Sequence, residues 1–278
     1  MLITKEERMF RIIAYILLIC GVVITLVPFI YMISVSLKSQ IYTFEYPPRL
    51  IPRDPTLENY IKALGKGLFG RNFLNSLFVA TATTISTLFI SSLMAYAFSR
   101  MRFPGKEVFF YILLLGMMIP PVMLIIPQFV IAKNLHLLDS LWGLIVVYVS
   151  ITLSMQTFLL RSFFETIPRE LEEAVLMDGG TRWVIFKKII LPLSKPGLAV
   201  VAIFTFLYAW NEFPWAHVAI KEASRRTLPV AIALFQSQYL TKWGLLFAAT
   251  TVASIPVIIV FVIFQRYFIQ GIVTSGLK

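Results

Sequence analysis

The chain has 278 residues, of which 58% are hydrophobic and only 14% are charged, and its formal net charge is +11. A soluble domain carries about 25% charged residues, so this chain cannot cover itself with a water-compatible surface, and we expect an integral membrane protein. Its 25 lysines and arginines are scattered over short loops. Without a clustered basic footprint, the composition argues against nucleic-acid binding and favours anionic lipid headgroups and acidic protein surfaces as partners.

The first apolar run predicts an uncleaved membrane span. Basic residues precede it, as in a signal peptide, but the run continues past Leu37 and no small-residue cleavage site closes it. Cys20 lies inside the run and is the only cysteine, so no intrachain disulfide is expected. We interpret its side chain as packed within lipid.

Five further runs reach the roughly 20 apolar residues that a helix needs to cross the hydrocarbon core. The six predicted spans are 11–37, 72–98, 108–132, 140–163, 196–217 and 244–265. None of them alternates apolar and polar residues as a barrel strand would. We therefore expect an all-α bundle that forms one transmembrane domain over residues 1–278.

The second and third spans carry distinctive residues. A stripe of small and hydroxyl residues on the second span predicts close helix packing, with a substrate-lining face as the alternative. Its members are Ala80, Thr84, Thr87, Ser91 and Ala95. Pro120, Pro121 and Pro127 interrupt the third span and predict a bend, because proline cannot donate a backbone hydrogen bond.

Glu212, in the sequence "FLYAWNEFPW", is the one carboxylate that clearly falls inside a predicted span. A charge at bilayer depth is costly and usually faces protein or a watery cavity. The flanking Trp210 and Trp215 suggest instead an anchor at the level of the headgroups. Both a pathway or gating role and an anchoring role remain open for this residue.

The fourth and fifth spans are joined by a polar loop, residues 164–195, which predicts two short helices. Glu170, Glu172 and Glu173 favour the start of a helix, where negative charge suits the helix dipole. Gly179-Gly180 is expected to end that helix, and Thr181 to cap the next one. Pro192 is expected to end the second helix, before Ser194 and Pro196 begin the fifth span.

The first helix of this loop is amphipathic, with Leu171, Ala174 and Val175 expected on one face. This face is too apolar to remain in water and too short to span lipid. It could pack on its own bundle, or it could insert into a groove on another protein. The residues alone leave these two alternatives open.

The spacing in this loop resembles the EAA motif of ABC importer permeases, which reads E-A-A, three residues, G, nine residues, I-x-L-P. Glu173-Ala174-Val175, Gly179 and Ile189-x-Leu191-Pro192 match it over about 20 residues, and Val175 is the one departure. The stretches "NSLFVATATTISTLFISSLMAYAFSRMRFPGK", "WNEF", "TLPVAI" and "QRYFIQGIVTSGLK" are similar to the carbohydrate-uptake branch of that family. The similarity covers nearly the whole chain.

The resemblance implies a type I ABC importer permease fold, with six transmembrane helices and both termini in the cytoplasm of a prokaryotic cell. It implies a second homologous permease subunit, two cytoplasmic ATP-binding-cassette subunits and an extracytoplasmic solute-binding protein as partners. ATP and magnesium would be bound by those ATPase subunits. This chain itself is expected to hold no cofactor and no metal, and to catalyse no reaction.

The resemblance also assigns roles to residues. The loop is implied to be the coupling helix that docks on an ATPase subunit, through Leu171, Glu173, Ala174, Val175, Asp178, Gly179, Ile189, Leu191 and Pro192. Glu173 is implied to pair with a basic residue of the ATPase. Gly271, Gly276 and Lys278 are implied to form a flexible tail that reaches the ATPase dimer. The outer segment 218–242 is implied to meet the solute-binding protein.

Candidate pathway residues follow from the groups that sugars require, which are hydroxyl-binding polar side chains and aromatic rings. They are Asn75, Tyr208, Trp210, Asn211 and Glu212. An ion-coupled secondary transporter remains an alternative, although such proteins tend to pair intramembrane acids. An ABC permease for glycerol phosphate or another non-sugar solute is a further alternative.

Overall fold

The computed structural model describes residues 5–39, 49–65, 67–238 and 242–275. Every regular element in these ranges is a helix, which confirms the predicted all-α fold. The described helices include four that are long and apolar enough to cross a membrane, or up to six if each of two bent pairs counts as one span. The chain divides into two compact units, residues 1–69 with 232–254, and residues 70–231 with 255–278.

The first unit contains α1 (Lys5–Ser36), α2 (Glu58–Gly65) and the beginning of α13 (Trp243–Ser275). Within this unit, α2 holds the end of α1 in place. The buried Asn59 amide on α2 donates hydrogen bonds to the carbonyls of Ser36, at 2.9 Å, and Lys38, at 2.7 Å. Gly244 makes room for this amide, because a Cβ there would lie 2.7 Å from the Asn59 nitrogen.

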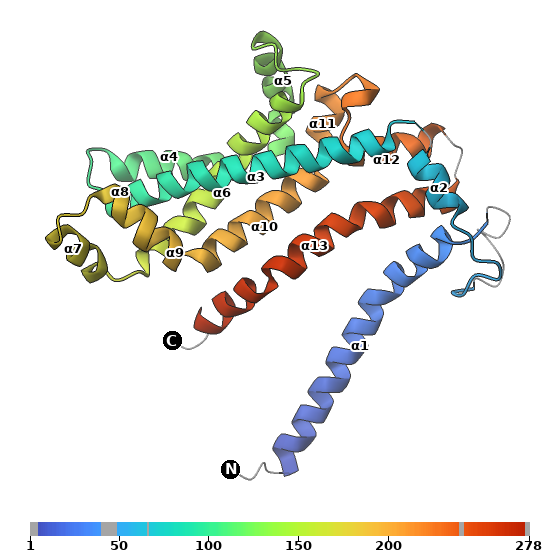
Figure 1. The fold of residues 1–278 in the computed structure, drawn as a ribbon, viewed down its shortest axis with the longest axis horizontal. Helices are drawn as coiled ribbons and strands as arrows, with labels where there is room; N and C mark the ends of the chain where they lie inside the picture. Colours follow the sequence, from blue (N-terminus) through green and yellow to red (C-terminus); the bar gives the residue numbers. More distant parts are fainter. Residues whose placement is uncertain (1–4, 40–48, 66, 239–241, 276–278) are drawn as a thin grey trace. The chain divides into compact units, whose positions relative to one another are not determined.

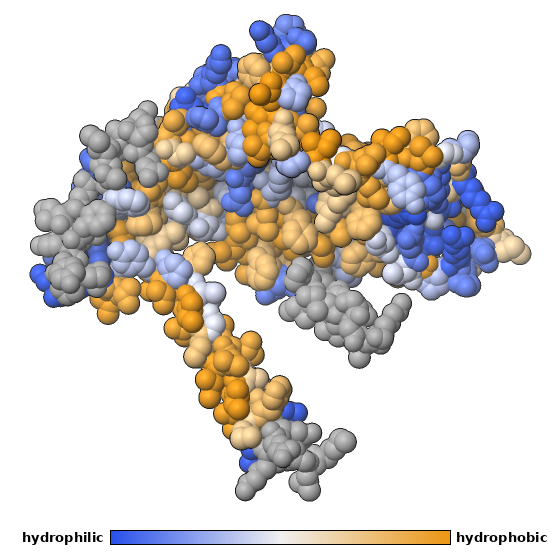
Figure 2. Space-filling view, turned by 180° about the vertical axis from the view of Figure 1, so that it is seen from behind, coloured by the Kyte–Doolittle hydropathy of each residue, from blue (hydrophilic) through white to orange (hydrophobic). Residues whose placement is uncertain are grey.

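The rest of α1 presents apolar side chains in every direction. Within its own unit, the most apolar stretch of Arg8–Ser36 is not buried, and Figure 2 shows α1 as a predominantly hydrophobic rod. Cys20 is exposed on it, as expected for a residue that faces lipid. A surface of this kind is stable only when lipid or another apolar helix covers it.

The second unit is built around α6 (Leu141–Glu165), which packs against α4 (Lys106–Met118) and α10 (Lys195–Asn211). The long helix α3 (Phe69–Arg100) contacts α6 through a buried hydrogen bond between the hydroxyls of Thr87 and Thr152, at 3.1 Å. All five members of the small-residue stripe are buried. The stripe therefore serves helix packing within the bundle.

The third predicted span is broken at its prolines. α4 ends at Met118, a 3-10 turn covers Pro121–Leu124, and α5 (Ile125–Asn134) leaves at 93° to α4. The bend predicted from the proline cluster is confirmed. It is too large for the single continuous span 108–132 that hydropathy suggests, because hydropathy counts apolar residues and carries no direction.

The fifth predicted span, 196–217, is also shorter than expected. α10 ends at Asn211, Glu212 adopts an extended conformation with ψ of 124°, and the six-residue α11 (Pro214–Ala219) follows. Pro214 explains the break, because it has no N–H to continue the helical hydrogen bonding of α10. In contrast, α13 continues about three turns beyond the predicted end at residue 265, to Ser275.

Candidate functional site

The loop between α6 and α10 folds into two short helices that lie at one end of α3 and α6 (Figure 1). α7 spans Glu170–Met177, and α8 spans Arg182–Ile185. The second helix continues as a π-helical turn, Phe186–Ile190, and then as α9, Leu191–Leu193. Hydrophilic residues gather at this end of the molecule in Figure 2, beyond the apolar surface of the spans.

Both glycines of the turn after α7 have a structural reason. Gly179 adopts φ of +76°, a left-handed conformation that costs glycine little. The Gly180 N–H donates to the Val175 carbonyl at 2.8 Å and the Gly179 N–H to the Leu176 carbonyl at 3.0 Å, which is a Schellman motif. A Cβ on Gly180 would lie 2.5 Å from Cγ1 of Val175. The predicted glycine C-cap is confirmed.

The second helix begins as predicted but does not end at Pro192. The Thr181 hydroxyl accepts a hydrogen bond from the Val184 N–H, at 3.4 Å, so this residue is the expected N-cap. Pro192 lies within α9, and the π turn precedes it. A π turn shifts the hydrogen-bond register by one residue, so the helix can accommodate a proline without an N–H. The chain bends only at Ser194, where the two axes differ by 76°.

One face of α7 packs on its own bundle. Val175 contacts an apolar core made of side chains from α3, α6, the second loop helix and α10. Its buried members are Ala95, Tyr96, Leu160, Phe164, Ile167, Ile185, Phe186, Ile190 and Val201. The crossing of α6 and α10 beside this core is close, since a Cβ on Gly197 would lie 2.7 Å from the Phe163 ring. This packing holds the loop firmly on the spans.

Much of the remaining surface of α7 is uncovered. Leu171 is 42% exposed and Met177 is 88% exposed, and Glu173 and Ala174 are exposed between them. Val175 shares a side of α7 with Leu171 and Ala174, as the helical spacing predicts, but Val175 is partly buried against the core while the other two residues are exposed. The uncovered residues, Leu171, Glu173, Ala174 and Met177, are called the outer face of α7 from here on.

The remaining motif residues support the loop from within. Ile189 and Leu191 are partly buried and pack against the same apolar core. Asp178 is exposed and forms the C-cap of α7. The I-x-L-P part of the motif thus anchors the loop on the spans, whereas the E-A part displays residues to the exterior. The C-terminal tail is the other predicted contact with the ATPase. Its Gly271 lies within the helix α13, while Gly276 and Lys278 lie outside the described residues.

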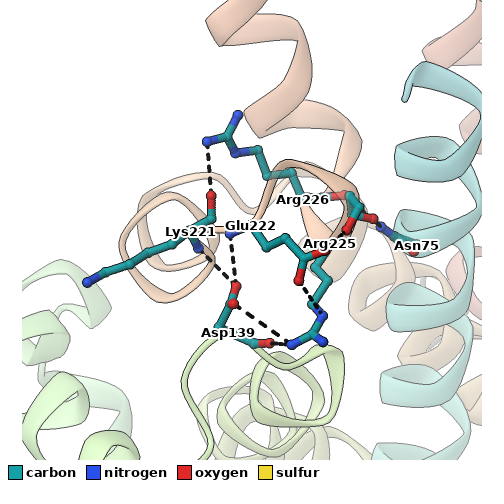
Figure 3. Close-up of polar contacts among 7 residues, drawn as sticks. Asn75, Asp139, Lys221, Glu222, Arg225 and Arg226 are labelled. Atoms are coloured by element: carbon teal, nitrogen blue, oxygen red, sulfur yellow. Dashed lines mark hydrogen bonds and ion pairs between the residues drawn. The ribbon is translucent and has the colours of Figure 1, made fainter. Parts of the chain in front are cut away.

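The end of the second unit opposite α7 carries a polar cluster, drawn in Figure 3. Asp139, with φ of 54°, accepts hydrogen bonds from the backbone N–H groups of Lys221 and Glu222, at 3.1 and 3.0 Å. The Arg225 guanidinium donates to the Asp139 carbonyl at 2.7 Å and contacts the Glu222 carboxylate at 3.0 Å. These contacts fix residues 220–226, which belong to the outer segment 218–242, on the turn before α6.

Asn75, a candidate pathway residue, belongs to this same framework. Its amide donates to the carbonyls of Ser224 and Arg226, at 2.9 and 3.0 Å (Figure 3). The hydroxyl of the next residue, Ser76, accepts a hydrogen bond from the Leu228 N–H at 2.7 Å. The Asn75 amide is therefore already hydrogen-bonded within the chain, where it holds the outer segment on α3.

Glu212 caps the short helix α11. Its carboxylate accepts hydrogen bonds from the N–H groups of Trp215, at 2.7 Å, and Ala216, at 3.0 Å, and from the Tyr148 hydroxyl at 2.5 Å. Three donors compensate its charge, as burial requires. The hydrogen-bond donors to Glu212 are thus backbone N–H groups at the start of α11 and a buried tyrosine of α6.

The other pathway candidates are divided between packing and the surface. Trp210 is buried, stacked on Phe206 and edge-on to Phe73. Tyr208 packs edge-on against Tyr148. Asn211 is exposed, and its amide bonds the carbonyl of Leu207 on the same helix. Among the described residues, no group of three or more His, Cys, Asp or Glu side chains is placed to hold a metal.

Two residues that organise the ends of this unit are not apparent from the sequence. Arg100 is buried at the base of the loop, and Asp139 organises the opposite end. Arg100 is one of several basic residues in a short loop, and nothing in that local pattern marks it as buried. Asp139 directly precedes the N-cap of α6, and acidic residues are common near the start of any helix because they suit its dipole.

Comparison with known proteins identifies the class. The family described as "Binding-protein-dependent transport system inner membrane component" matches residues 87–274, more than half of the chain. The chain belongs to this family, and it is a multi-pass membrane protein and a permease subunit of an ABC importer. The predicted resemblance to ABC importer permeases is therefore confirmed.

Particular relatives cover almost the entire chain. It is 37% identical over 278 residues to the trehalose/maltose transport system permease protein MalG of Thermococcus litoralis, across 99% of both chains. It is 35% identical over 274 residues to the diacetylchitobiose uptake system permease protein NgcG of Streptomyces coelicolor, across 98% of this chain and 90% of the relative. These relatives are permease subunits of transporters rather than enzymes.

A solved structure shares the fold. A bacterial ABC transporter involved in the import of the acidic polysaccharide alginate contains a chain with a TM-score of 0.84 and 28% identity to this one. The alignment covers 96% of this chain and 99% of that chain. The predicted type I ABC importer permease fold is thereby confirmed.

Proposed function

We propose that this chain forms half of the translocation pathway of an ATP-driven importer for a sugar or oligosaccharide. The observation that carries the proposal is the outer face of α7, an uncovered apolar and acidic surface on a firmly anchored loop. An amphipathic helix of this kind is suited to insertion into a groove on a partner protein. In this proposal the groove belongs to a cytoplasmic ATPase subunit, and Glu173 pairs with one of its basic residues.

The orientation follows from this docking. If α7 meets a cytoplasmic ATPase, then the end of the second unit that carries α7 is the cytoplasmic end, and the polar cluster of Figure 3 faces the exterior. Both termini then lie in the cytoplasm of a prokaryotic cell. ATP and magnesium are bound by two ATPase subunits, and this chain binds no cofactor.

A second permease subunit is the proposed occupant of the other half of the pathway. The apolar character of α1 on every side supports this assignment, because a helix from a homologous subunit can pack against such a helix together with membrane lipid. The substrate reaches the pathway from an extracytoplasmic solute-binding protein. The outer segment that Asp139 and Asn75 hold in place provides a defined surface on which such a protein can dock.

The substrate class rests on the relatives. The names of the two relatives include diacetylchitobiose, trehalose and maltose, all small oligosaccharides. Relatives with such names, aligned over nearly the whole length of the chain, favour a sugar over glycerol phosphate. They also favour ATP-driven import over ion-coupled transport.

Uptake by the assembled complex tests this function. We expect liposomes that contain this permease, its partner permease and the ATPase subunits to accumulate radiolabelled diacetylchitobiose, trehalose or maltose when the binding protein is outside and ATP is inside. Liposomes with a non-hydrolysable ATP analogue inside serve as the control and should accumulate none. Uptake driven by a proton or sodium gradient without ATP would contradict the proposal and favour a secondary transporter.

A further inference from the structure

Arg100 ends α3 and lies buried where three segments meet. Its side chain is only 5% exposed. The guanidinium Nη2 donates hydrogen bonds to the carbonyls of Phe164 and Ile167, the second at 2.6 Å, and Nε lies 2.9 Å from the carboxylate of Glu172. One side chain of α3 thereby joins the end of α6 and the helix α7.

The chemistry of these contacts suits a buried arginine. The C-terminus of a helix carries the negative end of the helix dipole, so the carbonyls of Phe164, in the last turn of α6, and Ile167, just after it, attract a cation. The planar guanidinium reaches several acceptors at fixed angles, which a lysine ammonium cannot do. Glu172 is only 15% exposed and faces Arg100, so its charge is neutralised where it is partly desolvated.

The contacts of Arg100 divide the acidic residues of α7 into two kinds. Glu172 is mostly buried and pairs with Arg100, whereas Glu173, the next residue, is exposed and forms no ion pair among the described contacts. Successive helical residues are about 100° apart, so neighbouring carboxylates serve different faces of the same helix. When α7 is displaced by a partner bound to its outer face, the Arg100–Glu172 ion pair opposes the displacement.

We infer that Arg100 and Glu172 are positioning residues that join α7 to α3 and α6, so that movement of the docked helix is transmitted to the membrane spans. This inference rests on the proposed docking of α7 and adds the link between docking and transport. The apolar core can slide or loosen as α7 moves, because its contacts have no direction. The Arg100–Glu172 ion pair opposes that movement, because the attraction between two partly desolvated charges falls as their separation grows.

A second polar contact in the same place is weaker. The Tyr96 hydroxyl, one turn before Arg100 on α3, donates to the carbonyl of Arg182 at 3.2 Å. This hydrogen bond connects α3 to the second loop helix and does not involve α7. Among the described contacts, the Arg100–Glu172 pair is therefore the charged link from α3 to α7.

Glu172→Gln tests the link selectively. The amide preserves the shape of the side chain and leaves the Arg100 bonds to the α6 carbonyls in place, while it removes the charge that attracts α7. In the complete complex in liposomes we expect the ATPase subunits to remain bound and ATP hydrolysis to continue. The number of substrate molecules imported per ATP hydrolysed should fall about tenfold, which is within the range that a single coupling residue controls.

Arg100→Lys is the second variant, because it keeps the buried positive charge but cannot reach all three acceptors. Glu165→Gln is the matched control, since Glu165 lies at the same end of α6 but is exposed and pairs with Arg161 rather than with α7 or Arg100. The control should import as many molecules per ATP as the wild type. A spin label at Met177 should become more mobile in both test variants and stay unchanged in the control.

The outcomes separate this inference from the proposed function. Wild-type import per ATP in both Glu172→Gln and Arg100→Lys would overturn the inference and leave the docking intact. Equal losses of import and of ATPase association, with unchanged label mobility, would also overturn it, because they would show that the pair only stabilises the assembly. If the wild-type chain binds no ATPase at all, the proposed function fails first.

Discussion

Gly179→Val is expected to reduce co-purification of the ATPase subunits strongly, whereas Gly179→Asn is expected to retain it. Gly179 has φ of +76°, and no atom lies within 4 Å of the place that a Cβ would occupy, so the penalty comes only from the backbone. A non-glycine residue in this conformation costs roughly 1–2 kcal/mol, and a β-branched residue costs more. The valine variant should relieve this strain by unwinding the turn and misplacing the outer face of α7.

The size of the effect can be bounded. A cost of roughly 1–2 kcal/mol corresponds to a five- to thirtyfold loss in affinity, if the strained turn is needed in the docked state. Asparagine is the matched control because it tolerates the left-handed conformation. Equal ATPase recovery with the valine variant and with the asparagine variant would contradict the requirement for this turn.

The second large effect is expected from Glu173→Lys. Glu173 is exposed and has no partner among the ion pairs described within this chain, so it is available to a basic residue of the ATPase. Reversing its charge replaces attraction with repulsion at the contact, which costs several kcal/mol. We expect association weaker by about a hundredfold or more, scored by ATPase co-purification at low and high salt.

Glu107→Lys is the control for that reversal. Glu107 is exposed at the start of α4, outside the α7 loop, and it contacts Arg161 at 3.7 Å. Arg161 retains Glu165, at 2.8 Å, so this variant should keep its fold and its ATPase. Equal losses in both variants would show a general effect of charge and would contradict a specific role for Glu173.

The membrane spans can be predicted largely from hydropathy, but their interruptions cannot. Six apolar runs indicate six spans because burying apolar side chains in lipid dominates their free energy. The right-angled turn between α4 and α5, and the end of α10 at Asn211, depend on single prolines and on which carbonyls they leave free. Counting apolar residues does not register either effect.

The sequence predicts the candidate site in part. The EAA spacing locates the loop, and the glycine turn and the Thr181 cap follow from local backbone chemistry. The burial of Val175 beside the exposed Leu171 and Ala174 cannot be predicted, because it depends on how the loop packs on α3 and α6. The role of Arg100 escapes sequence reasoning for the same reason, since its carbonyl partners lie 64 and 67 residues further along the chain.

From the sequence alone, polar residues inside the spans are easily mistaken for pathway residues. The sequence does not show which of them already form hydrogen bonds within the chain. Asn75 and Glu212 are the kinds of residue that bind sugars. The structure shows that both already hold backbone groups of their own chain, Asn75 in the outer segment and Glu212 at the start of α11. Among the five candidates, Asn211 is the residue with an exposed side chain.

Photo-crosslinking from Met177 tests most directly whether the outer face of α7 docks on an ATPase subunit. Met177 is 88% exposed on that face, and Leu135, exposed at the opposite end of the second unit, is the control position. In the intact complex, a photoreactive residue at 177 should crosslink to the ATPase subunit, and one at 135 should not. Crosslinks from 177 only to this chain or to the solute-binding protein would contradict the docking.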